Sequence, residues 1–175
     1  MKFKILSHAG LLIEHNDTQI VCDPWLIGSC YWRSWWNFPE PPSELFENLR
    51  PDYIYLTHLH WDHFHSPSLK KFFDPSIHIL VPKVPTRRMI EDLNWLGFHN
   101  VTEIKHGSEF QLGKDFTLRS YQFGLSVDSA ILVSGGGHTL LNCNDCKFFG
   151  LPLKQITSFR QPMKMRHNWR WSKKY

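Results

Sequence analysis

The chain has 175 residues, of which 42% are hydrophobic and 21% charged, and its formal net charge is +4. This length suits one hydrophobic core, so we expect a single domain with its own core. No apolar run approaches the ~20 residues that a membrane-spanning helix needs, and Met1-Lys2-Phe3-Lys4 leads into a strand pattern rather than a signal peptide. We therefore expect a cytoplasmic protein without a membrane partner.

The positive charge is concentrated at the end of the chain. Residues 154–175 hold seven of the 20 basic residues and no acidic residue, which leaves 13 basic and 16 acidic residues before them. We therefore divide the chain into a domain at 1–153 and a basic aromatic tail at 154–175. The Trp169-Arg170-Trp171 run in the tail is of a kind that stacks on nucleic acid, but a frayed terminus is the favoured interpretation and nucleic acid is not the expected partner.

Four cysteines are too few for the disulfide framework of a small secreted protein, so we expect reduced thiols. Cys143 and Cys146 form a CxxC pair. The alternatives to small buried residues are a redox pair or half of a zinc ribbon, and no second CxxC is present to complete a ribbon.

The chain opens with patterns typical of three strands, at residues 2–6, 11–15 and 20–22, which form a meander. His8 lies in the first turn, where a local hydrogen bond is at least as good an explanation as a catalytic role. Asp23 follows the third strand. Two roles remain open for it: orienting a ligand histidine, or capping the turn before Pro24.

Residues 25–42 show neither helical nor strand period and carry six aromatic residues among prolines and one glycine. Such a loop serves either as a lid or binding edge, or as a plug for the end of a sheet sandwich. Ser43 is the expected N-cap of a short helix that leads into a strand beginning near Asp52.

The most informative stretch is His58-Leu59-His60-Trp61-Asp62-His63, which places three imidazoles and a carboxylate directly after that strand. Because extended chain has a side-chain period of two, His58 and His60 point the same way. Asp62 and His63 can reach back once the chain turns, giving two ligand pairs for two adjacent metal ions. Imidazole with carboxylate suits zinc or iron. The alternative is a solvated loop, which the density and spacing of the ligands disfavour.

The remaining patterns alternate helix and strand. Ser66 is the expected N-cap of a helix reaching about Phe73, with Pro67 at its first position, and a second helix at 85–96 stops at Gly97. Strands are expected at 77–81, 101–104, 109–112, 116–121, 130–133 and 139–141. Sheet-rich halves flanked by helices indicate an α/β sandwich.

The HxHxDH run resembles the signature of the metallo-β-lactamase superfamily. Further motifs resemble, in the same order, the non-Rieske domain of the CMP-N-acetylneuraminate hydroxylases: Asp23-Pro24-Trp25-Leu26, Trp35-Trp36, Glu40-Pro41-Pro42-Ser43, Asp52-Tyr53-Ile54-Tyr55, Ser66-Pro67-Ser68-Leu69-Lys70-Lys71 and Asn142-Cys143-Asn144-Asp145-Cys146. The resemblance implies an αββα sandwich, incomplete in its second half because the likeness stops near Leu153.

The resemblance also implies a ligand set. In that family two histidines, here His58 and His60, hold one metal, while Asp62 and His63 hold the other and Asp145 bridges both. Bound metal lowers the pKa of water to ~7, and Asp62 is the expected catalytic residue that orients the resulting hydroxide.

Two departures from the family pattern concern histidines. Residues 121–127, directly before Asp128, contain no histidine, and the final histidine of the family pattern is absent. His106 and His138 are the nearby substitutes, of which His138 is expected in an exposed hairpin turn, and Asp128 is a further candidate ligand of the second metal.

Together these features predict a metal-dependent hydrolase with one or two zinc or iron ions, acting on a small molecule such as a sugar or nucleotide-sugar derivative. The alternatives are a non-catalytic metal-binding remnant and a nucleic-acid-binding protein that works through its tail. A complete hydroxylase is not expected, because the sequence contains no CxH…CxxH pair for a Rieske cluster. An incomplete second half predicts self-association or a partner that covers it.

Overall fold

The computed structural model describes residues 1–122, 128–146 and the backbone of 158–160. Its first sheet has six strands in the order β1-β2-β3-β6-β7-β8. The first three strands are antiparallel neighbours, and β3, β6, β7 and β8 pair in parallel. Their bounds are Lys2–Ile5, Leu11–His15, Thr18–Cys22, Tyr53–Tyr55, His78–Pro82 and Val101–Ile104.

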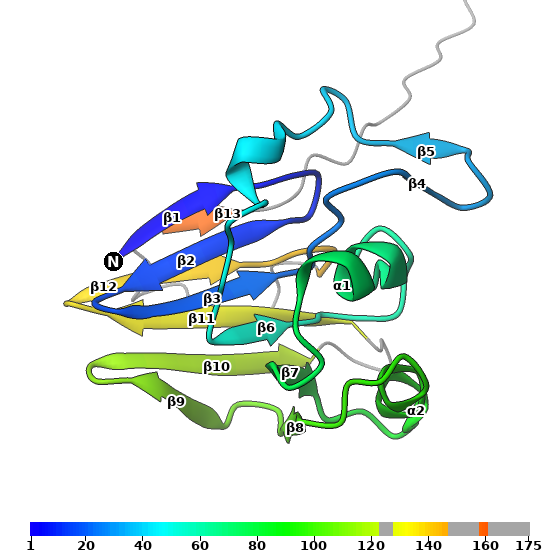
Figure 1. Cartoon of the computed structure of the whole chain (residues 1–175). Helices are drawn as coiled ribbons and strands as arrows, with labels where there is room; N and C mark the ends of the chain where they lie inside the picture. Colours follow the sequence, from blue (N-terminus) through cyan, green and yellow to red (C-terminus); the bar gives the residue numbers. More distant parts are fainter. Residues whose placement is uncertain (123–127, 147–157, 161–175) are drawn as a thin grey trace, which may run out of the picture.

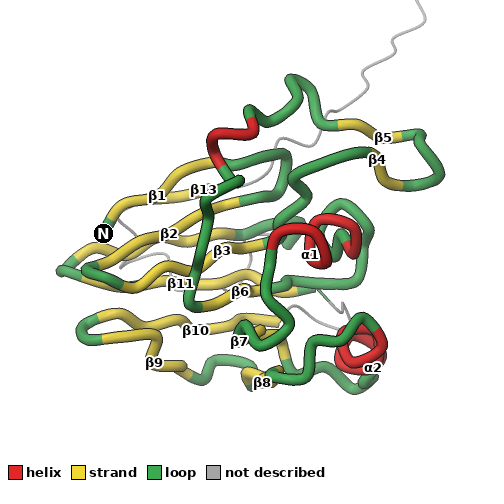
Figure 2. Tube along the Cα trace, viewed as in Figure 1, coloured by secondary structure: helices red, strands yellow, loops and turns green. Residues whose placement is uncertain are grey.

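The second sheet has the order β13-β12-β11-β10-β9. Strands β9 to β12 form an antiparallel meander, and β13 joins β12 in parallel. Their bounds, from β9 to β13, are Glu109–Gly113, Phe116–Gln122, Ser129–Gly135, His138–Asn142 and Ser158–Arg160. Figure 2 shows that strands make up most of the regular structure.

The two sheets face each other across a buried apolar core. Alternate residues of β2 and β3, such as Leu11, Ile13 and Ile20, pack with Phe116 and Val133 of the second sheet. The opposite face of the first sheet packs against two helices, α1 (Ser66–Phe72) and α2 (Arg88–Trp95). The described residues therefore confirm the mixed α/β fold with two facing sheets, and α1 and α2 lie together on one side of it (Figure 1).

Strand β1 lies at the edge of the first sheet with two apolar side chains uncovered. Phe3 and Ile5 pair with Ile13 and Leu11, whose side chains belong to the core between the sheets. Phe3 is nevertheless 49% exposed and Ile5 57% exposed. The described part of the second sheet therefore does not cover the inner face of the first sheet at β1.

Some expected helix boundaries differ from the structure. The N-cap of α1 is His65, whose side chain accepts a hydrogen bond from the backbone N–H of Ser68, so the expectation for Ser66 was wrong. Ser43 does not cap a helix either: a single 3-10 turn, η1 (Ser43–Leu45), follows Pro42 without a side-chain cap. α2 begins at Arg88, three residues after Pro85, and ends before Gly97, which has a φ of +98°.

Residues 25–42 are largely loop, as expected, but include a small hairpin of β4 (Ser29–Cys30) and β5 (Trp35–Trp36). Its turn holds Tyr31, Trp32 and Arg33 consecutively at positive φ. Left-handed backbone at a non-glycine residue costs roughly 1 kcal/mol or more, so other contacts must hold this turn in place.

All four cysteines are free and buried. Burial raises the pKa of the Cys143 thiol to about 11, which leaves it protonated and unreactive at neutral pH. No helix among the described residues is long and apolar enough to cross a membrane. Of the expected tail, β13 is described and pairs with β12, whereas residues 154–157 and 161–175, with the Trp169-Arg170-Trp171 run, lie outside the described residues.

Candidate metal centre

The site forms where the ends of strands from both sheets meet. Strand β3 ends directly before Asp23, and its parallel neighbour β6 leads through Leu56 and Thr57 into His58. From the second sheet, β12 leads into the turn that carries Asn144 and Asp145. Segments that are far apart in sequence therefore place their polar residues at one edge of the sandwich.

Three side chains bring potential metal-binding atoms together. His58, His60 and Asp145 each offer one ligand atom, and these atoms all lie within 4.8 Å of one another. The Nε2 atom of His58 is 2.8 Å from the Nδ1 atom of His60. This agrees with the period-two expectation that the two histidines point the same way. His58 is buried, whereas His60 and Asp145 remain accessible to solvent.

Buried carboxylates lie behind two of the histidines. Asp128 Oδ1 is 3.2 Å from Nδ1 of His58. Asp23 Oδ2 is 3.0 Å from Nδ1 of His63. When each Nδ1–H donates to its carboxylate, Nε2 of each ring keeps a free lone pair, which is the tautomer that binds a metal. Of the two roles considered for Asp23, the structure shows that it orients a histidine.

Asp128 thus contacts His58, whereas it was expected as a further ligand beside the Asp62–His63 pair. Asn144 is a neighbour of both Asp128 and His58: its side-chain amide donates to Asp128 Oδ1 at 3.3 Å and lies 3.3 Å from Nδ1 of His58. It also donates to the hydroxyl of Thr57. Sequence reasoning missed this role of Asn144, and its position beside Asp145 was the available signal.

Asp62 is held by three neighbours. The Tyr31 hydroxyl donates to Asp62 Oδ1 at 2.7 Å, while His63 Nε2 lies 3.3 Å and His8 Nε2 3.7 Å from Oδ2. Burial alone would raise the pKa of the Asp62 carboxyl, but the imidazole of His63 and the Tyr31 hydroxyl outweigh it and hold that pKa well below its usual range. Asp62 is therefore ionised at neutral pH.

His63 is buried between two carboxylates. Burial lowers its pKa, but the contacts with Asp23 and Asp62 outweigh burial and raise that pKa to about 10. The site thus favours a positive charge on or beside this ring. For His60 the balance is opposite, because partial burial and the neighbouring His58 ring lower the pKa and keep the imidazole neutral.

The donor set fits a divalent metal. Nε2 of His63 is buried and makes no hydrogen bond to any described residue, although Asp62 is near it. A buried nitrogen without a well-aligned hydrogen bond is costly unless a metal ion, or a proton held toward Asp62, completes its bonding. The neighbouring donors are imidazole nitrogens and carboxylate oxygens, which are the ligands of zinc and of non-haem iron.

The second predicted ligand group, Asp62 and His63 with Asp145, is less compact than the first, His58 and His60 with Asp145. Asp62 and His63 lie side by side, but within the described residues they do not form, with Asp145, a group of three ligand atoms as close as the first. His106 instead accepts a hydrogen bond from the backbone N–H of Gln122, and His138 is exposed in β12. Neither histidine joins the site. Residues 123–127, where the family histidine was sought, are outside the described residues.

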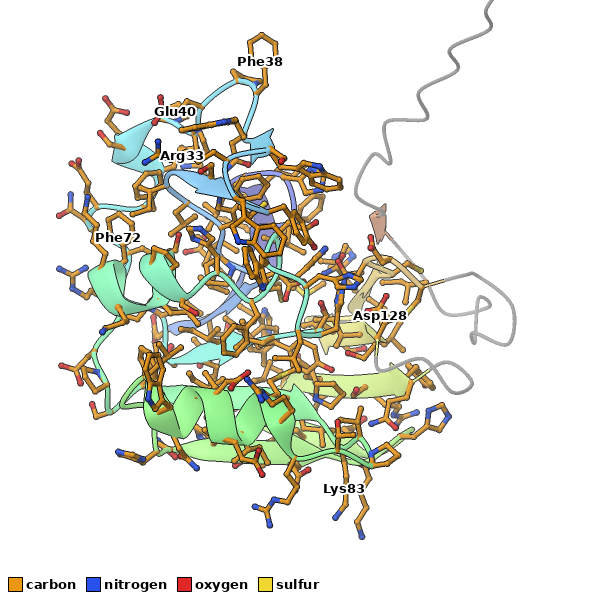
Figure 3. All side chains as sticks on the ribbon, turned by 90° about the vertical axis from the view of Figure 1, so that its right-hand side faces the viewer. Arg33, Phe38, Glu40, Phe72, Lys83 and Asp128 are labelled. Carbon is orange, nitrogen blue, oxygen red and sulfur yellow. The ribbon has the colours of Figure 1, made fainter. Side chains whose placement is uncertain are left out.

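The aromatic loop reaches both the core and the candidate site. Trp25 is buried in the core and contacts the rings of His8 and His65, so it acts as a plug. Tyr31 reaches Asp62 and stacks on Trp61 with the rings 5.7 Å apart and 6° from parallel. Phe38, at 95% exposure, projects away from the body of the molecule (Figure 3). The β4–β5 hairpin therefore forms one wall of the site.

Comparison with known proteins agrees with this geometry. Residues 2–150 match the model of the β-lactamase superfamily domain, and the chain belongs to that family. It is 35% identical over 147 residues to cytidine monophosphate-N-acetylneuraminic acid hydroxylase of Sus scrofa, an alignment that covers 80% of this chain and 34% of the relative. The resemblance inferred from the sequence motifs is therefore confirmed.

Two solved structures show the same fold. CmlA, a diiron β-hydroxylase from Streptomyces venezuelae, has a TM-score of 0.54 at 23% identity, covering 78% of this chain and 28% of that one. An isothiocyanate hydrolase from Delia radicum gut bacteria has a TM-score of 0.60 at 17% identity, covering 81% and 61%. The chain spans about a quarter to a third of the length of the curated hydroxylases it matches.

Proposed function

We propose that this chain is a metal-dependent hydrolase, with zinc or iron bound at His58, His60 and Asp145. The observation that carries the proposal is the convergence of these three ligand atoms within 4.8 Å, in a chain of the β-lactamase superfamily. Three protein ligands with an open position are typical of a catalytic metal site. A second ion would take Asp62 and His63 together with Asp145, which gives one or two ions per chain.

When bound, the metal would supply Lewis acidity that lowers the pKa of a water and polarises the bond under attack. The residues of the chain hold the geometry. Asp128 and Asp23 fix the rings of His58 and His63 through their Nδ1 atoms. Asp62 stays ionised, with Tyr31 on Oδ1, so its carboxylate can accept a hydrogen bond from a water and orient it.

The substrate class is a proposal from resemblance. Since the named relative acts on a cytidine monophosphate sugar acid, we propose a sugar or nucleotide-sugar derivative as the substrate of this chain. A second candidate function is oxygen-dependent hydroxylation, which the 35% identity to a hydroxylase and the fold shared with CmlA both favour. That reaction needs a source of electrons, and residues 1–175 carry no CxH…CxxH pair that could hold a Rieske cluster.

Hydrolysis can be tested with p-nitrophenyl acetate and bis(p-nitrophenyl) phosphate on chain reconstituted with zinc or with ferrous iron. We expect turnover that a chelator abolishes, that Asp62→Asn lowers at least ~100-fold, and that His138→Ala, a change of an exposed histidine, leaves unaltered. Turnover no greater than that of the His58→Ala/His60→Ala double variant would favour the non-catalytic remnant. Iron-dependent consumption of oxygen without hydrolysis would favour the hydroxylase.

Nucleic-acid binding through the tail has a separate test. Salt-sensitive binding to an oligonucleotide, lost on deletion of residues 154–175, would support that alternative.

A further inference from the structure

A cavity of about 840 Å³ lies against the ligand-bearing loop. Its walls come from β4, from the stretch before α1 and from α2, three elements that lie along the same side of the molecule in Figure 1. The side chains that line it are mostly apolar or aromatic, and Leu59, Phe64 and Leu96 are among them. This volume is in the range of ~300–1,000 Å³ that is usual for small-molecule sites.

The cavity is separate from the metal centre. None of His58, His60, Asp62, His63 and Asp145 lines it. Leu59 and Trp61 do line it, and they alternate with the histidines and Asp62 along the chain. One loop therefore contributes side chains to both the metal centre and the cavity.

Two indole rings are available to a ligand in the cavity. Trp61 is 42% exposed; the Tyr31 ring stacks on it and the Trp32 ring lies 4.8 Å away, so part of its indole is open to a ligand. Trp95, the last residue of α2, is 85% exposed. Exposed indole rings at the wall of a cavity bind planar rings by stacking and bind cations through their π faces.

The charged groups around the cavity favour a cation over an anion. Arg88 Nε is 2.9 Å from the carboxylate of Asp92, so these two side chains neutralise each other. Glu91 adds a further negative charge from the same helix. From the facing wall comes His65, whose Nδ1 lies 2.8 Å from the hydroxyl of Ser68. The charge left at the rim is therefore negative.

We propose that this cavity is a second ligand site, which binds a small organic cation carrying an aromatic ring. The ring would stack on the indoles of Trp61 and Trp95, and the positive charge would lie toward Glu91. This site does not depend on the proposed hydrolase function, because it shares no ligand residue with the metal centre.

The test compares tryptamine with indole-3-acetate, two probes that share one ring and carry opposite charges. Isothermal titration calorimetry at pH 7 should show tryptamine binding with a Kd of ~1 mM or below, at least ~10-fold tighter than indole-3-acetate. Trp95→Ala and Glu91→Gln should each weaken tryptamine binding at least ~3-fold, and Glu91→Gln should reduce the preference for the cation. Both residues are exposed, so these variants will fold.

Two controls make the test specific. Trp36→Ala removes another exposed indole that does not line this cavity, and it should leave the Kd unchanged. The His58→Ala/His60→Ala variant should also bind tryptamine normally. Equal binding of the two probes, no tryptamine binding at ~10 mM, an unaltered Kd in Trp95→Ala, or loss of binding in the double histidine variant would each overturn the proposal.

Discussion

Asp23, which follows β3, and His63, in the ligand loop after β6, form a fully buried pair. Asp23 Oδ2 lies 3.0 Å from Nδ1 of His63. The same carboxylate accepts hydrogen bonds from the backbone N–H and the hydroxyl of Thr57, at 2.9 and 2.8 Å. Asp23 has a φ of +44°, a conformation that aspartate adopts more readily than most residues. One side chain therefore joins the end of β3 to the ligand loop and sets the orientation of its third histidine.

Replacing Asp23 by asparagine should weaken both fold and site. The amide cannot accept from all three donors, so we expect the free energy of unfolding in urea to fall by about 3 kcal/mol. Metal affinity, measured by competition with a chromophoric chelator, should fall by roughly 10- to 100-fold because His63 loses the partner that fixes its ring.

The matched control is Asp52→Asn. Asp52 also accepts a backbone hydrogen bond, from Gln19 at 2.8 Å, but it is exposed and lies at the opposite end of β6 from the ligand loop. This change should cost less than about 1 kcal/mol and leave metal affinity unaltered. Equal effects of the two substitutions would mean that Asp23 has no special role.

Tyr31→Phe tests the contact between the aromatic loop and Asp62. The substitution keeps the ring stacked on Trp61 but removes the hydroxyl that donates to Asp62 at 2.7 Å. We expect a loss of about 1 kcal/mol in urea unfolding. Tyr31→Ala should cost more, since it also removes the ring contacts with Trp61 and Trp35. A Tyr31→Phe variant as stable as the parent chain would show that the hydrogen bond contributes nothing to holding the turn.

Tyr55→Phe tests the polar link between the two sheets. The buried hydroxyl of Tyr55, in β6, lies 2.8 Å from both Ser120 and Ser129 of the second sheet. Its removal leaves two buried serine hydroxyls with fewer partners, so thermal and urea unfolding should show a loss of about 1–2 kcal/mol. Tyr53→Phe, two residues earlier in the same strand, removes a hydroxyl from a partly buried ring that packs on His78 and Phe110. A larger loss for Tyr53→Phe than for Tyr55→Phe would contradict this assignment.

The uncovered face of β1 predicts self-association. Phe3 and Ile5 extend the inner face of the first sheet without cover from the described residues. Light scattering on a sizing column should therefore give a mass above that of the monomer, rising with concentration. Phe3→Thr/Ile5→Thr should shift the chain toward monomer, whereas Lys2→Thr/Lys4→Thr, on the opposite face of the strand, should not. A parent chain that stays monomeric at every concentration would rule out this role for β1.

Much of the fold could be predicted from sequence because the periodicity was clear. The strands of the opening meander, the ligand loop after β6 and the end of α2 at Gly97 all follow local patterns. The turn at Tyr31–Arg33 could not be predicted, since tyrosine, tryptophan and arginine carry no local preference for left-handed backbone. The N-cap was assigned to Ser66 because serine is a common cap, but the preceding His65 takes that role, since its side chain accepts a hydrogen bond from the backbone N–H of Ser68.

The candidate site divides in the same way. The convergence of His58 and His60 follows from strand geometry, and the placement of Asp145 beside them agrees with the family resemblance. The pairing of Asp128 with His58 depends on how the second sheet packs on the first, 70 positions away in sequence, and no local pattern specifies it. The role of Asn144 beside Thr57 has the same long-range origin.

The central claim is that the chain holds a metal at His58, His60 and Asp145, and elemental analysis of purified protein tests it most directly. After expression with added zinc or iron, we predict one or two ions per chain. The ions should be lost from the His58→Ala/His60→Ala variant and retained by His138→Ala, whose histidine is exposed and lies outside the site. Less than roughly a tenth of an ion per folded chain would contradict the account, because three protein ligands with an open position should retain a catalytic metal through purification.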